Sequence, residues 1–132
     1  MTDSDLPRER PLSPHIQIYS PMLTMMMSIV HRITGAALYF GTLLVVWWLV
    51  AAASGGAYFD LVNGFFASWF GRLILFGYTW AAIHHMLGGI KHLVWDTGRG
   101  FELASAELSA RLTLGGSIVL TILLWVIAYG MK

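Results

Sequence analysis

Histidines at positions 84, 85 and 92 stand close together in an otherwise apolar stretch. The segment that holds them, WAAIHHMLGGIKHLVW at 80–95, contains one other ionisable side chain, Lys91. Ionisable groups are costly inside a membrane span, and an apolar helix that keeps them there has a functional reason by default. This segment is therefore the first candidate for a functional site.

Helical geometry sends these histidines in two directions. His85 and His92 are seven residues apart, so they lie within about 20° of each other and about 10 Å apart along the axis. His84 points about 100° away from them. Gly89 lies on the His85 face and lets a flat group such as a haem ring lie against the backbone. His85 lies about 9 Å below the boundary set by Lys91, a suitable depth for haem iron.

A second polar group precedes the first long apolar run. Ser28, His31 and Arg32 share one helical face. One haem whose propionates emerge at this level accounts for His31, Arg32 and His92 together. A single histidine in a membrane helix is about as often a hydrogen-bonding group as a ligand, and cations at helix ends commonly snorkel. Those separate explanations do not predict that all of these groups meet at one membrane face.

The segments that carry these residues are apolar enough to cross a membrane. The chain has 57% hydrophobic and 11% charged residues, whereas about 25% charged residues is usual in a soluble domain. Segments 33–59, 73–90 and 112–131 contain no Lys, Arg, Asp or Glu, and each is long enough for a membrane helix of about 17–25 residues. No segment alternates like a barrel strand. We therefore expect an all-α integral membrane protein with three transmembrane helices.

Local signals predict the boundaries of these helices. Residues 1–20 are rich in proline and form a polar arm, and Ser20-Pro21 is typical of an N-cap followed by the first helical residue. Ser54-Gly55-Gly56 ends the first helix, and the aromatic segment 58–70 suits a short connection in the opposite interface. The predicted domains are the cytoplasmic arm, 1–20, and a transmembrane domain, 21–132, with helices at about 21–53, 72–95 and 105–131.

Composition and charge exclude several other classes of protein. The chain has no cysteine, which excludes disulfides, thiolate-bound iron–sulfur clusters and covalently attached c-type haem. A net charge of +1 gives no support for nucleic-acid binding. Acidic residues near the start stand where a signal peptide is positive, so we expect the first helix to remain in the membrane.

The distribution of basic residues predicts the orientation in the membrane. Two of them, Arg72 and Lys132, fall on one side. The other six fall on the side of the N-terminus: Arg8, Arg10, Arg32, Lys91, Arg99 and Arg111. The positive-inside rule therefore predicts a cytoplasmic N-terminus and a periplasmic C-terminus.

Motifs in three parts of the chain resemble those of a known family. They are S-P-H-x-x-x-Y at 13–19, S-x-x-H-R-x-T-G at 28–35 and H-x-x-x-G-I-K-H-L-x-W-D at 85–96. Together they resemble the cytochrome b556 subunit of succinate dehydrogenase, the larger of the two membrane anchors of that complex. Size, number of spans and orientation also agree, so the resemblance covers almost the whole chain.

The resemblance implies a role for each histidine of the site. His85 matches the axial ligand of one haem b, which is shared with a second, smaller anchor subunit that supplies the other axial histidine. His31, Arg32 and His92 match positions near the haem propionates. His84 departs from the family pattern, and the helical face favours His85 as the ligand.

The resemblance also implies electron transfer in the tricarboxylic acid cycle and the respiratory chain. Succinate is oxidised at a flavoprotein subunit, and electrons pass through an iron–sulfur subunit to ubiquinone at a bacterial inner membrane. Ser28 and Arg32 match the ubiquinone site. This chain has no catalytic residue for the succinate step, so its tasks are to anchor the complex among membrane lipids, bind haem and form part of the quinone pocket.

Three other functions remain open. The chain could anchor a quinol:fumarate reductase that runs the reaction in reverse. It could be a haem-free transporter or proton-relay subunit whose histidines carry protons, in which case the purified protein has no haem spectrum. It could also be a purely structural anchor, in which case quinone activity survives the loss of His85 and Arg32.

Overall fold

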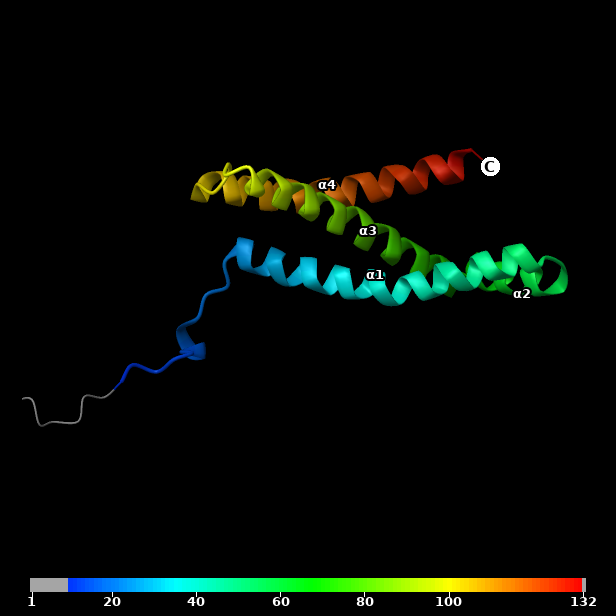
Figure 1. The fold of residues 1–132 in the computed structure, drawn as a ribbon, viewed down its shortest axis with the longest axis horizontal. Coiled ribbons are helices and arrows are strands. Elements are labelled where there is room, and N and C mark those ends of the chain that lie inside the picture. Colours follow the sequence, from blue (N-terminus) through cyan, green and yellow to red (C-terminus); the bar gives the residue numbers. More distant parts are fainter. Residues whose placement is uncertain (1–9, 132) are drawn as a thin grey trace, which may run out of the picture.

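Helices form most of the chain that the computed structural model describes, residues 10–131 (Figure 1). They are η2 (Ile16–Ile18), α1 (Leu23–Ser54), α2 (Gly56–Ala67), α3 (Trp69–Asp96) and α4 (Leu103–Gly130). The described residues contain no strand, and α1, α3 and α4 are long and apolar enough to cross a membrane. The prediction of an all-α membrane protein with three spans is confirmed. The predicted membrane orientation rests in part on Arg8 and Lys132. Both lie outside the described residues, as does the start of the arm.

The first long helix begins later than the serine–proline signal predicts. Its N-cap is Met22, which has an extended backbone, and no side chain caps the helix. The predicted N-cap at Ser20 is therefore wrong. A serine caps a helix only when the residues directly after it turn into that helix, and here Pro21 and Met22 continue the arm instead.

A helical hairpin closes the end of the molecule opposite the arm (Figure 1). Gly55 and Gly56 have φ values of +66° and +60°, a region that favours glycine, and they end α1 where the sequence predicts. The prediction of a short connection over 58–70 is wrong, because the helix α2 occupies most of this segment. The helix is stabilised by packing against α1. The buried residues of this contact are Ala51, Val62 and Phe66.

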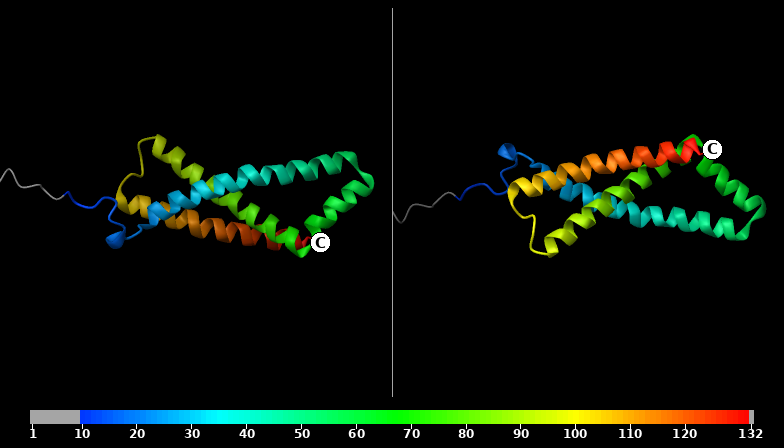
Figure 2. Two further views of the ribbon diagram at one scale, coloured as in Figure 1. Left: turned by 90° about the horizontal axis from the view of Figure 1, so that it is seen from below. Right: turned by 90° about the horizontal axis from the view of Figure 1, so that it is seen from above.

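The third helix, α3, lies between the other elements and contacts α1, α2 and α4. At its start, the backbone N–H of Gly71 donates a hydrogen bond to Ser68 Oγ (3.1 Å). The helix α3 crosses α1 in both views of Figure 2. At its end, Trp95 Nε1 donates to the carbonyl oxygen of Gly100 (3.0 Å) and orders the turn into α4. Because α3 has neighbours on different sides, adjacent residues along it face different helices.

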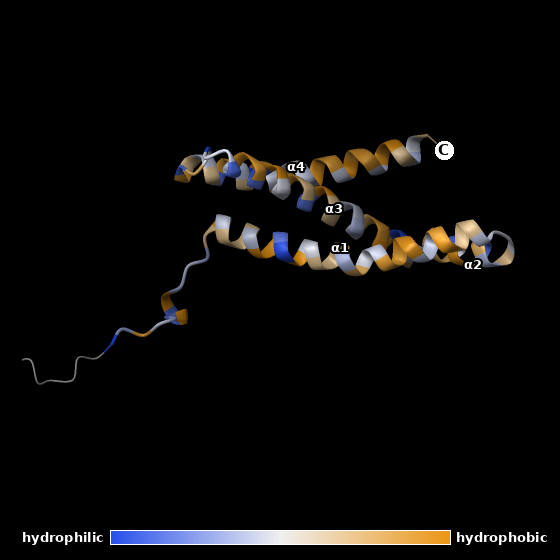
Figure 3. Ribbon diagram, in the orientation of Figure 1, coloured by the Kyte–Doolittle hydropathy of each residue, from blue (hydrophilic) through white to orange (hydrophobic). Residues whose placement is uncertain are grey.

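Apolar residues predominate in the three long helices (Figure 3), and many of their large side chains are exposed. In the most apolar window of α1, 6% of the residues are buried inside the chain, and in those of α3 and α4 the share is 17%. So large an apolar surface requires lipid or other protein to cover it. The chain is therefore an integral membrane bundle with a small core of its own.

Candidate functional site

Histidines of α1 and α3 meet in the half of the molecule nearest the arm. The ring of His31, on α1, stacks on the ring of His85, with centroids 4.0 Å apart and an interplanar angle of 4°. The centroid of the same ring lies 5.4 Å from that of His92. His85 and His92 share one face of α3, as their spacing predicts, and a single ring from α1 contacts both.

Glycines on both helices allow this close approach. A Cβ atom at Gly88 would lie 2.8 Å from His31 Cε1, and one at Gly35 would lie 3.0 Å from His85 Cε1. Each ring therefore packs against a glycine of the opposite helix. Gly89, the glycine singled out by its spacing, makes no such contact within 4 Å among the described residues. The surface at Gly89 stays open beside His85, and the haem contact expected there stays a prediction.

A methyl group at Gly88 is expected to destabilise the contact between α1 and α3. Gly88→Ala places Cβ against the His31 ring, and overpacking of this kind costs about 1–3 kcal/mol in the free energy of unfolding. Detergent-induced unfolding, followed by circular dichroism, measures this loss. Gly115→Ala, in α4, is the matched control because its Cβ meets no atom within 4 Å. Equal destabilisation of the two variants contradicts the close packing at Gly88.

The hydrogen-bond partners of Nδ1 determine the tautomer of the His85 ring. His85 Nδ1 lies 3.1 Å from the carbonyl oxygen of His31 and 3.4 Å from Thr34 Oγ1. A carbonyl oxygen only accepts, so Nδ1 carries the proton and the lone pair of the neutral ring is on Nε2. Thr34 Oγ1 donates its own proton to the same carbonyl oxygen (2.9 Å). Thr34 was missed as a site residue, although it belongs to the S-x-x-H-R-x-T-G motif.

The second ring nitrogen of His85 is suited to a metal. Among the described residues, His85 Nε2 has no hydrogen-bond partner, and it is not enclosed by them. A histidine that ligates a metal characteristically donates its other N–H to a carbonyl or carboxylate, which fixes the tautomer and the orientation of the ring. His85 has this arrangement, with the carbonyl supplied by His31.

The neighbouring histidine faces the other way. The side chain of His84 is 1% exposed, and its Nδ1 lies 3.1 Å from Ser117 Oγ of α4. Its Nε2 is buried without a hydrogen-bond partner among the described residues. His84 and His85 therefore point in different directions, as helical geometry predicts. The packing of α3 determines that His84 contacts α4 and His85 contacts α1.

The other polar residues of α1 lie on its surface. Ser28 and Arg32 are exposed, whereas His31 is half-buried against α3. Within residues 10–131, no hydrogen bond or ion pair joins the side chain of Ser28 or Arg32 to another residue. Lys91 Nζ lies 4.6 Å from the centre of the Trp95 ring. Ser28 and Arg32 are thus accessible to another molecule, as is the exposed His92 of α3.

The donor set fits haem better than a centre ligated only by protein. The described residues contain no group of three or more His, Asp or Glu side chains placed to hold a metal ion. A haem requires less of the chain, because the macrocycle supplies the equatorial ligands and one histidine serves as an axial ligand. His85, with its oriented ring and the open surface at Gly89, meets that requirement.

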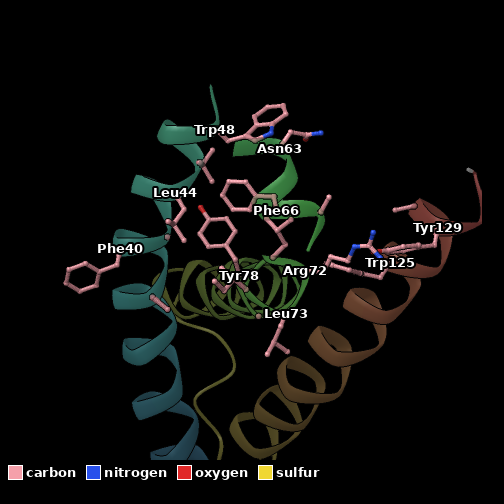
Figure 4. Close-up of a pocket in the computed structure, with 18 residues that line it drawn as sticks. Phe40, Leu44, Trp48, Asn63, Phe66, Arg72, Leu73, Tyr78, Trp125 and Tyr129 are labelled. Carbon is pink, nitrogen blue, oxygen red and sulfur yellow. The ribbon is translucent and has the colours of Figure 1, made fainter. Parts of the chain in front are cut away.

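A large apolar cavity lies at the other end of the molecule, away from these histidines (Figure 4). Its volume is about 1010 Å³, and residues of all four α-helices line it. Arg72 extends toward α4, where its guanidinium carbon lies 5.8 Å from the centre of the Tyr129 ring. The walls of this cavity are far apart along the chain, so the sequence does not reveal it. Ser28, Arg32 and His85 do not line it.

Comparison with known proteins identifies relatives of nearly the same length. The family described as succinate dehydrogenase/fumarate reductase transmembrane subunit matches residues 7–124. The succinate dehydrogenase cytochrome b556 subunit of Paracoccus denitrificans is 42% identical, over 91% of this chain and 92% of that protein. That of Rickettsia conorii is 34% identical, over 95% and 98%. The succinate dehydrogenase cytochrome b560 subunit of Reclinomonas americana is 32% identical, over 89% and 85%.

Proposed function

Since this chain belongs to the succinate dehydrogenase/fumarate reductase transmembrane subunit family, we propose that it is the cytochrome b anchor of a succinate dehydrogenase. In this role it binds haem b through His85 and forms part of the site that reduces ubiquinone. The family and the three long apolar helices establish an integral membrane protein related to subunits of an oxidoreductase complex. The haem and quinone roles go beyond the family assignment and are what we propose for this chain.

The orientation of the His85 ring is the observation that carries the haem assignment. The His31 carbonyl oxygen holds Nδ1–H, and Nε2 is left with its lone pair in an unenclosed position. A bound haem supplies a one-electron redox centre. His85 would hold the haem iron from this chain, and a histidine of the smaller anchor subunit would hold it from the other. We assign the propionate contacts to His31, Arg32 and His92, which lie at the same end of the bundle.

Exposed polar groups near the start of α1 support the quinone assignment. Arg32 stabilises the negative charge that develops on a quinone oxygen during reduction, an effect that is strong where little water is present. Ser28 donates a hydrogen bond to a quinone carbonyl. Both side chains are accessible on this chain, so residues of the iron–sulfur subunit and of the smaller anchor complete the pocket. The electrons come from succinate, which is oxidised in the flavoprotein subunit.

The membrane orientation follows from the basic residues. Arg32, Lys91, Arg99 and Arg111 belong to the end of the bundle where α1 begins and α3 turns into α4, and Arg72 belongs to the other end. The positive-inside rule places the first of these ends at the cytoplasm. The quinone pocket then faces the cytoplasmic side of a bacterial inner membrane, where the soluble subunits bind.

A haem spectrum of the purified complex tests this function. The complex is isolated from membranes in mild detergent through a tag on this chain. It is expected to show a b-type reduced-minus-oxidised spectrum and to reduce ubiquinone with succinate. A complex without haem supports the transporter or proton-relay alternative. A complex that oxidises quinol with fumarate faster than it reduces ubiquinone with succinate supports the fumarate reductase alternative.

A further inference from the structure

We propose that His84 and Ser117 form a buried positioning pair that sets the rotation of α3 and thereby holds His85 toward α1. The inference rests on the proposed role of His85 as the haem ligand. His84 does not touch the haem in this account. It acts through the backbone of α3, on which the two histidines are adjacent.

The hydrogen bonds of Ser117 assign the proton on His84. Ser117 Oγ donates its single proton to the carbonyl oxygen of Leu114 (2.8 Å). It can therefore only accept from His84, so Nδ1 of His84 carries the proton and donates across 3.1 Å. The lone pair of the neutral His84 ring is on Nε2, which is buried inside the bundle. His84 is thus a donor to α4 and is closed to an iron on the surface.

Two consecutive residues therefore tie α3 to two different helices. His84 donates to Ser117 of α4, and His85 donates to the carbonyl oxygen of His31 of α1. A rotation of α3 by one residue, about 100°, breaks both hydrogen bonds. Loss of the hydrogen bond between His84 and Ser117 removes one of the two bonds that fix the rotation of α3, so the direction of His85 becomes less well defined.

The membrane makes such hydrogen bonds important for the rotation of a helix. Lipid is as apolar as the helix surface, so hydrophobic burial does not select which face of α3 points inward, and packing and interhelical hydrogen bonds do so instead. The buried hydroxyls on either side of Ser117 do not reach α3 at this level. Thr113 Oγ1 and Thr121 Oγ1 donate to carbonyl oxygens of their own helix, those of Ser109 (2.8 Å) and Ser117 (2.7 Å).

Another side-chain hydrogen bond between α3 and α4 lies farther from the ligand. Trp125 Nε1 donates to Thr79 Oγ1 across 3.4 Å. It is longer than the bond between His84 and Ser117, and Thr79 is six residues from His85, whereas His84 is adjacent to it. The pair of His84 and Ser117 is therefore the closer restraint on the ligand.

The test compares five variants of the complete complex with the wild type. His84→Leu and Ser117→Ala each remove the hydrogen bond between the two side chains. The double variant loses the same single bond. His84→Asn retains a donor near the position of Nδ1. Thr121→Val is the matched control, because it removes a buried hydroxyl of α4 that bonds only within α4. The readouts are the electron paramagnetic resonance signal of the haem, which reports axial-ligand orientation, and the rate of haem transfer to excess apomyoglobin.

His84→Leu and Ser117→Ala are expected to shift the resonance signal in the same direction. We expect haem transfer to accelerate between about threefold and about twentyfold, the range that interhelical hydrogen bonds in membranes span. The double variant is expected to add nothing to the single variants. His84→Asn is expected to keep the wild-type signal, and Thr121→Val is expected to leave both readouts unchanged.

Wild-type signals and transfer rates in both His84→Leu and Ser117→Ala overturn the positioning role, as does an equal effect of Thr121→Val. If His84→Leu does not assemble, Ser117→Ala decides alone, since it removes one hydroxyl. His85→Ala is measured in parallel. Haem retained in His85→Ala contradicts the proposed function. If His85→Ala loses haem but the variants at His84 and Ser117 behave as wild type, the positioning role alone is contradicted.

Discussion

His85→Ala is expected to abolish the b-type haem signal of the complex. The variant removes the imidazole whose Nε2 is the proposed axial ligand, and neither of the two histidines beside it, His84 and His31, is placed to replace it. His84 is buried against α4, and His31 packs on Gly88 with its Nδ1 enclosed. The reduced-minus-oxidised spectrum, scaled to the flavin content of the complex, measures the loss.

The control for this variant is His84→Asn, which changes the adjacent histidine of the same helix and keeps a hydrogen-bond donor for Ser117. It is expected to retain haem at the wild-type ratio to flavin. Co-purification of the flavoprotein subunit shows whether each variant still assembles. An assembled His85→Ala complex with its full haem content contradicts the ligand assignment, and loss of haem in both variants removes the distinction between the two histidines.

Arg32→Ala is expected to lower succinate:ubiquinone reductase activity by about a hundredfold to a thousandfold. The guanidinium is exposed on this chain and, in the proposed quinone pocket, would stabilise the negative charge that develops on the quinone oxygen. Removing one such stabilising group typically costs this much. Ser28→Ala removes a neutral hydrogen bond and is expected to cost about threefold to tenfold. Both variants are expected to retain haem, because neither removes the iron ligand.

Two activities of the same preparations separate the quinone site from the rest of the complex. Succinate oxidation with an artificial acceptor that takes electrons before the quinone site is expected to be unchanged, while ubiquinone reduction falls. Arg111→Ala is the matched control, since Arg111 is an exposed cation predicted on the same side of the membrane and is paired with Glu107 (3.4 Å). Undiminished ubiquinone reduction in both Arg32→Ala and Ser28→Ala refutes the quinone assignment.

Properties of single helices could be predicted from the sequence. Each span is a run of apolar residues without charge, and such a run forms a membrane helix wherever it occurs in the chain. The angle between His84 and His85 is likewise set by the helix itself. The Gly55-Gly56 end of α1 was predictable because positive φ is a local property of glycine.

Errors arose where local signals compete with packing. Segment 58–70 has no strong helix signal of its own, and α2 forms there because Val62 and Phe66 are buried against α1. Ser20 has the side chain of an N-cap, but the chain stays extended through Met22. In both places the conformation depends on neighbours that are distant in sequence or on the path of the following residues.

The residues that could form a haem and quinone site, and the membrane face on which they gather, were determined by the sequence alone, because residue type, helical period and span length are local. The neighbour of each residue was decided by the tertiary structure. The crossing of α1 and α3 stacks His31 on His85 and packs the two rings against Gly88 and Gly35. The contact of α3 with α4 buries His84 against Ser117. The periodicity of one helix gives the directions of its side chains, but only the packing of several helices determines what lies in each direction.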